Sequence, residues 1–153
     1  MAIDWSRLGL PKPEPRRRTK RRRERQERAV KQDVRAQCVE RDGSCRLAGA
    51  VFCVERQARL YERTYTPVER HRCSGPSEWA HLGENRRAKT VGQDPAVRHT
   101  VHGSLMLCRG AHAAYDGRAR PRIEIEEQSR SGADGALRFT WKGLVYVEDQ
   151  TEG

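Results

Sequence analysis

The sequence lacks long apolar stretches and has few aromatic side chains. Apolar residues make up 35% of the 153-residue chain and aromatic residues only 6%, whereas charged residues make up 34%. A chain of this length has room for one compact domain and an extension. Its small core is expected to need additional stabilisation, for example by a bound metal ion.

No apolar run is long enough for a signal peptide or for a membrane-spanning helix. We therefore expect an intracellular protein with reduced thiols and without a membrane partner. The chain has five cysteines, an odd number. In a reducing compartment, clustered cysteine and histidine indicate metal binding or catalysis sooner than disulfides.

Acidic residues are outnumbered by basic ones, 21 against 31, which gives a net charge of +10. The excess is concentrated in residues 16–28 (RRRTKRRRERQER), where nine Lys or Arg stand against two Glu. Such a stretch attracts polyphosphates mainly by releasing condensed counterions, an effect that depends on salt and not on sequence. The alternatives are a solvated tail or a targeting signal; membrane binding is disfavoured because the stretch has no apolar face. The residues expected to contact DNA are Arg16, Arg17, Arg18, Lys20, Arg21, Arg22, Arg23 and Arg25 in this arm, and Arg86, Arg87 and Lys89 in a later loop.

Four segments are expected along the chain. Residues 1–15 contain three prolines and form an extended lead-in. Residues 16–41 form a basic helical arm, because no Gly or Pro interrupts them and Asp42-Gly43 then provides a turn. Residues 42–120 form the core, in which residues 46–70 fit both a helix and a strand pattern. Residues 121–153 contain three short apolar runs and are expected to form an antiparallel β-meander.

The residues best suited to chemistry lie between Ser77 and Asp116. The segment EWAHL, a polar loop, the apolar run SLML and a segment with helical spacing follow one another, which predicts strand, loop, strand and helix. His112 and Asp116 stand four residues apart and would share one face of that helix. The first strand would carry His81 across from this face, so that a base and a metal site could reach one phosphodiester.

This region resembles the HNH (ββα-metal) endonucleases, in particular the small phage-type members. The likeness covers about residues 37–118 and is carried by Arg41-Asp42-Gly43-Ser44-Cys45, Ala80-His81-Leu82, His102-Gly103 and the segment from Leu107-Cys108 to His112. The resemblance implies an α+β fold, with a ββα-metal core between the basic N-terminal helix and the C-terminal meander. It also implies hydrolysis of DNA phosphodiester bonds, by nicking or cutting the duplex, in the cytoplasm of a bacterial or phage-infected cell.

The same resemblance implies roles for three histidines. His81 is the general base that deprotonates water, and His112 binds a divalent cation, most often Mg²⁺. The family's middle Asn is missing, and His102 stands nearest to its place; many relatives also carry His or Asp where this chain has Ala80. His102 would orient the base or complete the cation site, and His99 and Asp116 compete for the second of these duties.

Relatives with paired CxxC units use four thiolates to bind a structural zinc ion. Here both pairs have lost one member, because Ala48 and Ala111 stand where the second Cys would be. A set of four remaining thiols satisfies tetrahedral zinc in number; the alternative is that they are small buried side chains that pack as apolar groups. The four expected zinc ligands are Cys45, Cys53, Cys73 and Cys108.

Several alternatives stay open at this point. Cys38 is expected to be buried within the helix, and His71, between two arginines, is expected at the surface. The departures from the family pattern leave room for a zinc-stapled protein that binds nucleic acid without cleaving it. An RNA-directed nuclease is a third alternative, because phosphate attraction does not distinguish the two polymers. Small phage nucleases of this type often act beside a DNA-packaging terminase, so the resemblance suggests that machinery as a partner.

Overall fold

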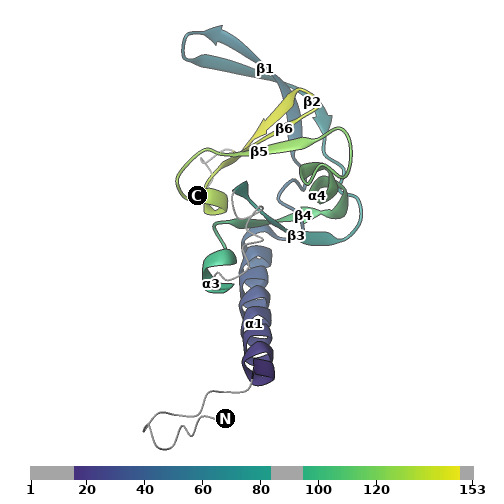
Figure 1. Cartoon of the computed structure of the whole chain (residues 1–153). Coiled ribbons are helices and arrows are strands. Elements are labelled where there is room, and N and C mark those ends of the chain that lie inside the picture. Colours follow the sequence, from purple (N-terminus) through teal and green to yellow (C-terminus); the bar gives the residue numbers. More distant parts are fainter. Residues whose placement is uncertain (1–15, 84–94, 149–153) are drawn as a thin grey trace, which may run out of the picture.

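The computed structural model describes residues 16–83 and 95–148. Its elements, in chain order, are α1 (Arg16–Asp42), β1 (Val51–Arg59), β2 (Glu62–Arg70), β3 (Ser77–His81), α3 (Pro95–Arg98), β4 (Ser104–Cys108), α4 (Arg109–Tyr115), β5 (Ile123–Glu127), the 3-10 turn η2 (Gly132–Asp134), β6 (Leu137–Trp141) and β7 (Leu144–Val147). Figure 1 shows a compact body from which α1 and the β1–β2 hairpin project in opposite directions.

The strands form two separate antiparallel sheets. Five of them lie in the order β2-β1-β7-β6-β5, and β3 pairs with β4 in a two-stranded hairpin. The main core lies where α4 and the β3–β4 hairpin pack against the five-stranded sheet, with Phe52, Leu107, Ala111 and Phe139 buried together. Strand β6 supplies this core with one face, through the buried Leu137 and Phe139, whereas every residue of β4 is buried.

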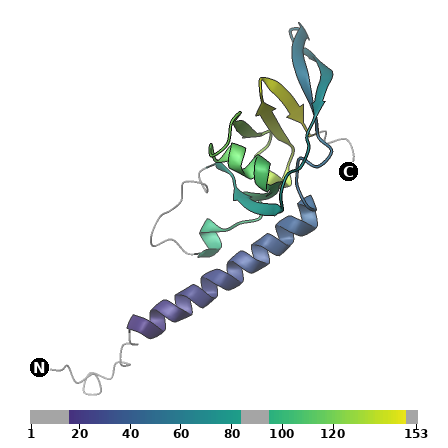
Figure 2. The same cartoon turned by 90° about the vertical axis from the view of Figure 1, so that its right-hand side faces the viewer.

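Helix α1 contacts the body along its second half, from Glu27 and Val30 onward. Val34 and Cys38 pack against Met106 of β4 in a small second cluster, which confirms that Cys38 is a buried apolar residue. Gly43, with a φ of 67°, ends the helix and donates a hydrogen bond to the carbonyl of Val39, as is common at helix C-termini. The basic first half of α1 extends beyond the body in both views (Figures 1 and 2).

A network of charges fixes the last turn of α1. The carboxylate of Asp42 accepts hydrogen bonds from Arg41, from Arg46 and from the backbone N–H of Met106, at 2.6 to 2.9 Å. Arg41 also donates to the carbonyl of Ser104 at 2.7 Å. The exit of the basic helix is thereby tied directly to β4.

The expected ββα-metal core fold is wrong, although the α+β class is compatible with the structure. Most of the strands form one antiparallel sheet, which continues from β5, β6 and β7 into β1 and β2, so the C-terminal strands are not a separate meander. The join is the pairing of Cys53 with Val145. No local pattern reveals a pairing between residues so far apart in the sequence, and the ambiguous segment 46–70 concealed the β1–β2 hairpin.

Among the helices of the described residues, none is long and apolar enough to cross a membrane.

Candidate metal centre

Four side chains from three separate stretches of the chain meet beside the first turn of α4. Cys45 lies in the turns that follow α1, His71 follows β2 directly, Cys73 lies between β2 and β3, and Cys108 is the last residue of β4. Their sulfur and imidazole nitrogen atoms all lie within 4.8 Å of one another. This cluster, called the Cys3His cluster below, could hold a metal ion.

The backbone around the Cys3His cluster is fixed by hydrogen bonds. The N–H of Cys108 donates to Sγ of Cys45 at 3.1 Å, and the N–H of Ala111 donates to Sγ of Cys108 at 3.5 Å. Cys108 is therefore both a cluster residue and the N-cap of α4. Sγ of Cys108 also lies 3.5 Å from Nε2 of His71.

In the absence of a bound cation, the thiols of Cys45 and Cys73 stay protonated at neutral pH. Burial raises the pKa of Cys45 to about 12 and raises the pKa of Cys73, because a thiolate is poorly solvated there. Burial lowers the pKa of His71, which favours the neutral, metal-binding imidazole. All five cysteines are free thiols in the structure. A bound divalent cation would displace the thiol protons, because the thiolate is the form that binds metal.

The cluster contains three of the four expected zinc ligands, and its fourth member was not expected. Cys53 points away, because it alternates along β1 with Phe52, which is fully buried in the core. His71, expected at the surface, is half-buried instead, with its ring 6.4 Å from that of Trp141. The spacing His71-Arg72-Cys73 was the available signal, since the two residues stand only two positions apart.

A second group of polar side chains surrounds His112 on α4. Nδ1 of His112 lies 2.9 Å from a carboxylate oxygen of Glu78 on β3, and Nε2 lies 3.4 Å from Asp116. The structure thus joins the expected pair His112 and Asp116 and adds Glu78, which sequence reasoning missed. Alternation along β3 could have indicated it, because Glu78 shares a strand face with the buried Ala80.

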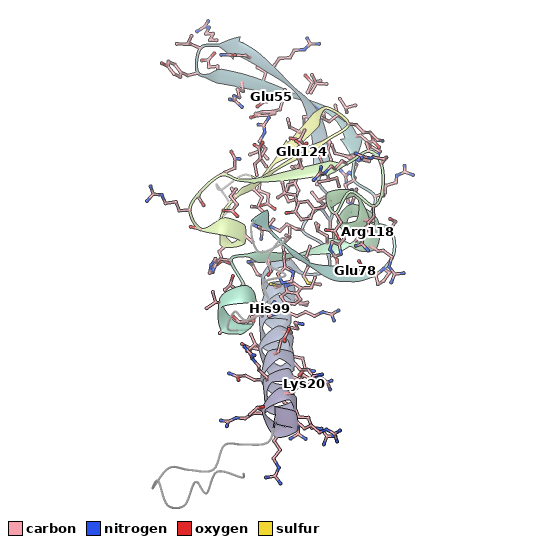
Figure 3. All side chains as sticks on the ribbon, viewed as in Figure 1. Lys20, Glu55, Glu78, His99, Arg118 and Glu124 are labelled. Carbon is pink, nitrogen blue, oxygen red and sulfur yellow. The ribbon has the colours of Figure 1, made fainter. Side chains whose placement is uncertain are left out.

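Two arginines flank this group. Arg109 donates to Glu78 at 2.8 Å, and Arg118 donates to Asp116 at 2.8 Å. The hydrogen bond from Arg109, followed by that from His112, lowers the pKa of Glu78, so this carboxylate is ionised at neutral pH. Figure 3 labels Glu78 and Arg118 on the α4 side of the body.

His81 lies on the opposite face of the β3–β4 hairpin from His112. Its ring centroid is 4.3 Å from that of Trp79, and its Nε2 is 3.1 Å from Nδ1 of His99. Trp79 packs against the small cluster at α1, and Nε2 of His99 lies 3.7 Å from Glu27 of that helix. The expected convergence of the two imidazoles on one phosphate is therefore not seen in these contacts, because adjacent positions of a strand face opposite sides.

The other expected site residues are dispersed. His102 lies in the turn before β4, where its carbonyl accepts a hydrogen bond from the N–H of Ala133 at 2.7 Å. The basic side chains of α1 from Arg17 to Arg25 are exposed to solvent. The backbone of Arg16 begins the helix, whereas Arg86, Arg87 and Lys89 lie outside the described residues.

Comparisons of the chain with family models, with curated proteins and with solved structures find no match in any of the three.

Proposed function

We propose that this chain binds DNA and hydrolyses its phosphodiester bonds with a divalent cation held at His112, and that a zinc ion in the Cys3His cluster fixes the helix that presents this histidine. The observation that carries the proposal is the double position of Cys108, which belongs to the cluster and also caps α4. Four residues after this cap, His112 lies between two carboxylates. Metal binding at one site would thus organise the other.

Zinc is the metal that best suits three thiols and one imidazole. Tetrahedral zinc with bonds of about 2.0–2.3 Å places its donor atoms about 3.4–3.8 Å apart. The four donor atoms already lie within 4.8 Å of one another, so a small adjustment of the side chains would complete the site. A site with four protein ligands is closed, and its role is structural.

The group around His112 has the arrangement of a histidine poised to bind a cation. Glu78 accepts from one ring nitrogen, which leaves Nε2 to face Asp116 at 3.4 Å. A carboxylate that orients the second nitrogen is the usual neighbour of a metal-binding histidine. Two neighbouring ligands of an octahedral Mg²⁺ ion, with bonds of about 2.1 Å, lie about 3 Å apart. The 3.4 Å between Nε2 of His112 and Asp116 is close to this separation. Water would complete the coordination of such a hard cation.

The surroundings of His112 also suit a phosphodiester. The side chains of Arg109 and Arg118 have exposed fractions of 64% and 62%. A guanidinium group can bind phosphate with two parallel hydrogen bonds. A cation held by Asp116 would compete with Arg118 for the carboxylate and so release the guanidinium for the substrate. The bound cation would neutralise the phosphate and stabilise the departing oxygen.

Supercoiled plasmid tests the proposal. We expect nicked or linear product with Mg²⁺ and none with EDTA, and we expect His112→Ala and Asp116→Asn to abolish cleavage while plasmid binding persists. Glu124→Gln removes an exposed carboxylate of β5 that does not belong to the His112 group, and this variant should cleave as the wild type does. Cleavage that persists in His112→Ala would overturn the cation site proposed here.

The general base is a separate question that the same assay addresses with His81→Ala. Loss of cleavage with unchanged binding supports the base role that the resemblance implies for His81. Retained cleavage means that water is activated on the α4 face, for example as a cation-bound hydroxide. A single-stranded RNA substrate, run in parallel, distinguishes an RNA-directed nuclease.

A second candidate is a zinc-stapled protein that binds DNA without cleaving it. The observation that favours it is the placement of His81 and His112 on opposite faces of the β3–β4 hairpin. In that function the carboxylates around His112 would only hold the ring against α4. Equal plasmid binding with Mg²⁺ and with EDTA, without any product, would support this candidate.

A further inference from the structure

The β1–β2 hairpin projects from the body as a two-stranded ribbon (Figures 1 and 2). Its base is tied to the sheet by the pairing of Cys53 with Val145 and by the ion pair between Glu55 and Arg138 at 2.6 Å. Every residue from Arg56 to the end of β1, and along β2 as far as Pro67, is exposed to solvent. Among the described residues, this outer half pairs only within the hairpin.

The tip of the ribbon carries two large apolar residues. Leu60 and Tyr61 form the two-residue turn between Arg59 and Glu62, and their exposed fractions are 76% and 94%. Two-residue hairpin turns usually hold Gly, Asn or Asp, because these residues accept positive φ. Lys142 is the one non-glycine residue with positive φ in the described chain. The turn between β1 and β2 thus has neither the residue types nor the positive φ angles of a usual two-residue hairpin turn. Exposed apolar surface of this kind indicates a binding site for a partner.

The charge of the outer ribbon indicates what kind of partner fits. Residues 56–63 contain three arginines and one glutamate. Arg59 and Arg63 keep exposed fractions of 83% and 59% in their side chains although each lies near a glutamate. The exposed apolar tip and the arginines beside it are complementary to a surface on which negatively charged groups flank flat rings that a side chain can stack on.

We propose that the β1–β2 ribbon inserts into a groove of duplex DNA, with Leu60 and Tyr61 against the bases and the neighbouring arginines on the phosphates. The major groove of B-form DNA is about 12 Å wide and admits a two-stranded ribbon. Apolar side chains can also wedge between base steps from the minor groove. This inference rests on the proposed DNA binding, to which it adds a second contact that is separate from α1.

The test measures binding of a labelled 30-base-pair duplex by fluorescence anisotropy, in EDTA-free buffer without Mg²⁺, over a range of KCl concentrations. The double variant Leu60→Ser/Tyr61→Ser should lose about five- to tenfold in affinity at every salt concentration. Its salt slope should stay unchanged, because the lost contact carries no charge. Tyr61→Phe alone should keep the wild-type affinity, because the ring can still stack.

Two further variants separate apolar from ionic contributions. Arg56→Gln/Arg59→Gln should lower the slope of log K against log salt by about two, since each phosphate contact contributes about 0.9. Val68→Ser removes an apolar residue that is 59% exposed at the body end of β2, and this variant should bind as the wild type does. Unchanged metal content and unfolding temperature would verify that all variants are folded.

The outcomes distinguish this inference from the function on which it rests. Wild-type affinity in the tip double variant overturns the ribbon contact and leaves binding through α1 intact. Failure of the wild-type chain to bind duplex overturns the proposed function itself. Normal DNA binding combined with loss of self-association in the tip variant, measured by light scattering, would assign the tip to a protein contact and overturn the inference.

Discussion

Sγ of Cys108 lies 3.5 Å from Nε2 of His71, and this contact joins the first turn of α4 to the end of the β1–β2 hairpin. The same sulfur accepts the capping hydrogen bond from Ala111. One side chain thereby links the hairpin, β4 and the helix that carries His112. Changes in the Cys3His cluster are therefore expected to reach both the ribbon and the proposed cation site.

Replacing Cys73 by Ser should remove bound zinc and lower the unfolding temperature by roughly 10 °C or more, because a structural zinc ion contributes directly to folding. Metal analysis of the purified protein and calorimetry measure the two effects. Cys53→Ser is the matched control, since this partly buried thiol lies outside the cluster, and it should keep both metal and stability. Equal zinc content in the two variants would contradict the assignment.

Glu78→Gln tests the orientation of His112. The amide keeps the size of the side chain but removes the charge that accepts from Nδ1, so the cation affinity should fall by about ten- to a hundredfold. The Mg²⁺ concentration that gives half-maximal plasmid cleavage reports this change. The same concentration dependence in the wild type and the variant would mean that Glu78 only pairs with Arg109.

The ion pair between Glu55 and Arg138 predicts a loss of stability in acid. The hydrogen bond from Arg138 lowers the pKa of Glu55 to about 2 against the opposing effect of burial, and Arg63 and Tyr65 add to it. Because the folded pKa lies below the ordinary value of about 4.3, the contribution is present above that value and is lost as the pH falls towards 2.

Glu55→Gln should therefore lower the free energy of unfolding by about 1 kcal/mol at pH 6, after allowance for solvent screening of a partly exposed pair. Urea denaturation of wild type and variant at pH 6, 4 and 2 measures the difference, and any acid release of metal affects both proteins alike. We expect the difference to shrink below pH 4. A constant difference across this range would show that lost packing, not charge, causes it.

Asp42→Asn should be strongly destabilising. The side chain of Asp42 is fully buried between Arg41 and Arg46, and hydrogen bonds from Arg41, Met106 and Arg46 lower its pKa although burial opposes ionisation. The neutral amide removes the anion that the two guanidinium groups share. Arg41 keeps Asp134 and Arg46 keeps Glu148 as partners, so the expected cost is about 2 kcal/mol. Urea denaturation measures the loss. Asp33→Asn, at an exposed position of the same helix, should change stability by less than about 0.5 kcal/mol.

The basic half of α1 should set the salt dependence of DNA binding. Changing Arg17, Arg18, Arg21, Arg22 and Arg25 to Gln removes five exposed charges and should lower the slope of log K against log salt by up to about four. Arg130→Gln, on the exposed turn after β5, is the single-charge control and should change the slope by less than one. An unchanged slope in the fivefold variant would exclude α1 as the main phosphate contact.

Local patterns in the sequence predicted the elements that depend on neighbouring residues. The uninterrupted stretch of residues 16–41 predicted α1, and the order of two strands and a helix after Ser77 agrees with β3, β4 and α4. Three of the four cluster residues were also identified, because free thiols in a polar chain are few. These features need only helical or strand periodicity and residue chemistry.

Features that depend on long-range pairing were missed. Val54, Ala58, Tyr61 and Tyr65 fit a helical pattern, whereas only residues 51–54 fit a strand. The β1–β2 hairpin depends on pairing with β7, which this local pattern does not contain. Cys53 was expected in the cluster, and His71 is found there instead. The reason is that Cys53 lies on the side of β1 opposite to the buried Phe52. The placement of His81 could have been inferred, because Ala80 packs towards α4 and the next residue of a strand must face the other way.

The opposite directions of α1 and the β1–β2 hairpin set the length of duplex that could contact the far ends of both. A helix of 27 residues is about 40 Å long, and strands of nine residues reach about 30 Å. Together these lengths match about 20 base pairs of B-form DNA. Short oligonucleotides could therefore occupy one projection at a time, and tight binding would appear only once the duplex is long enough to bridge the body.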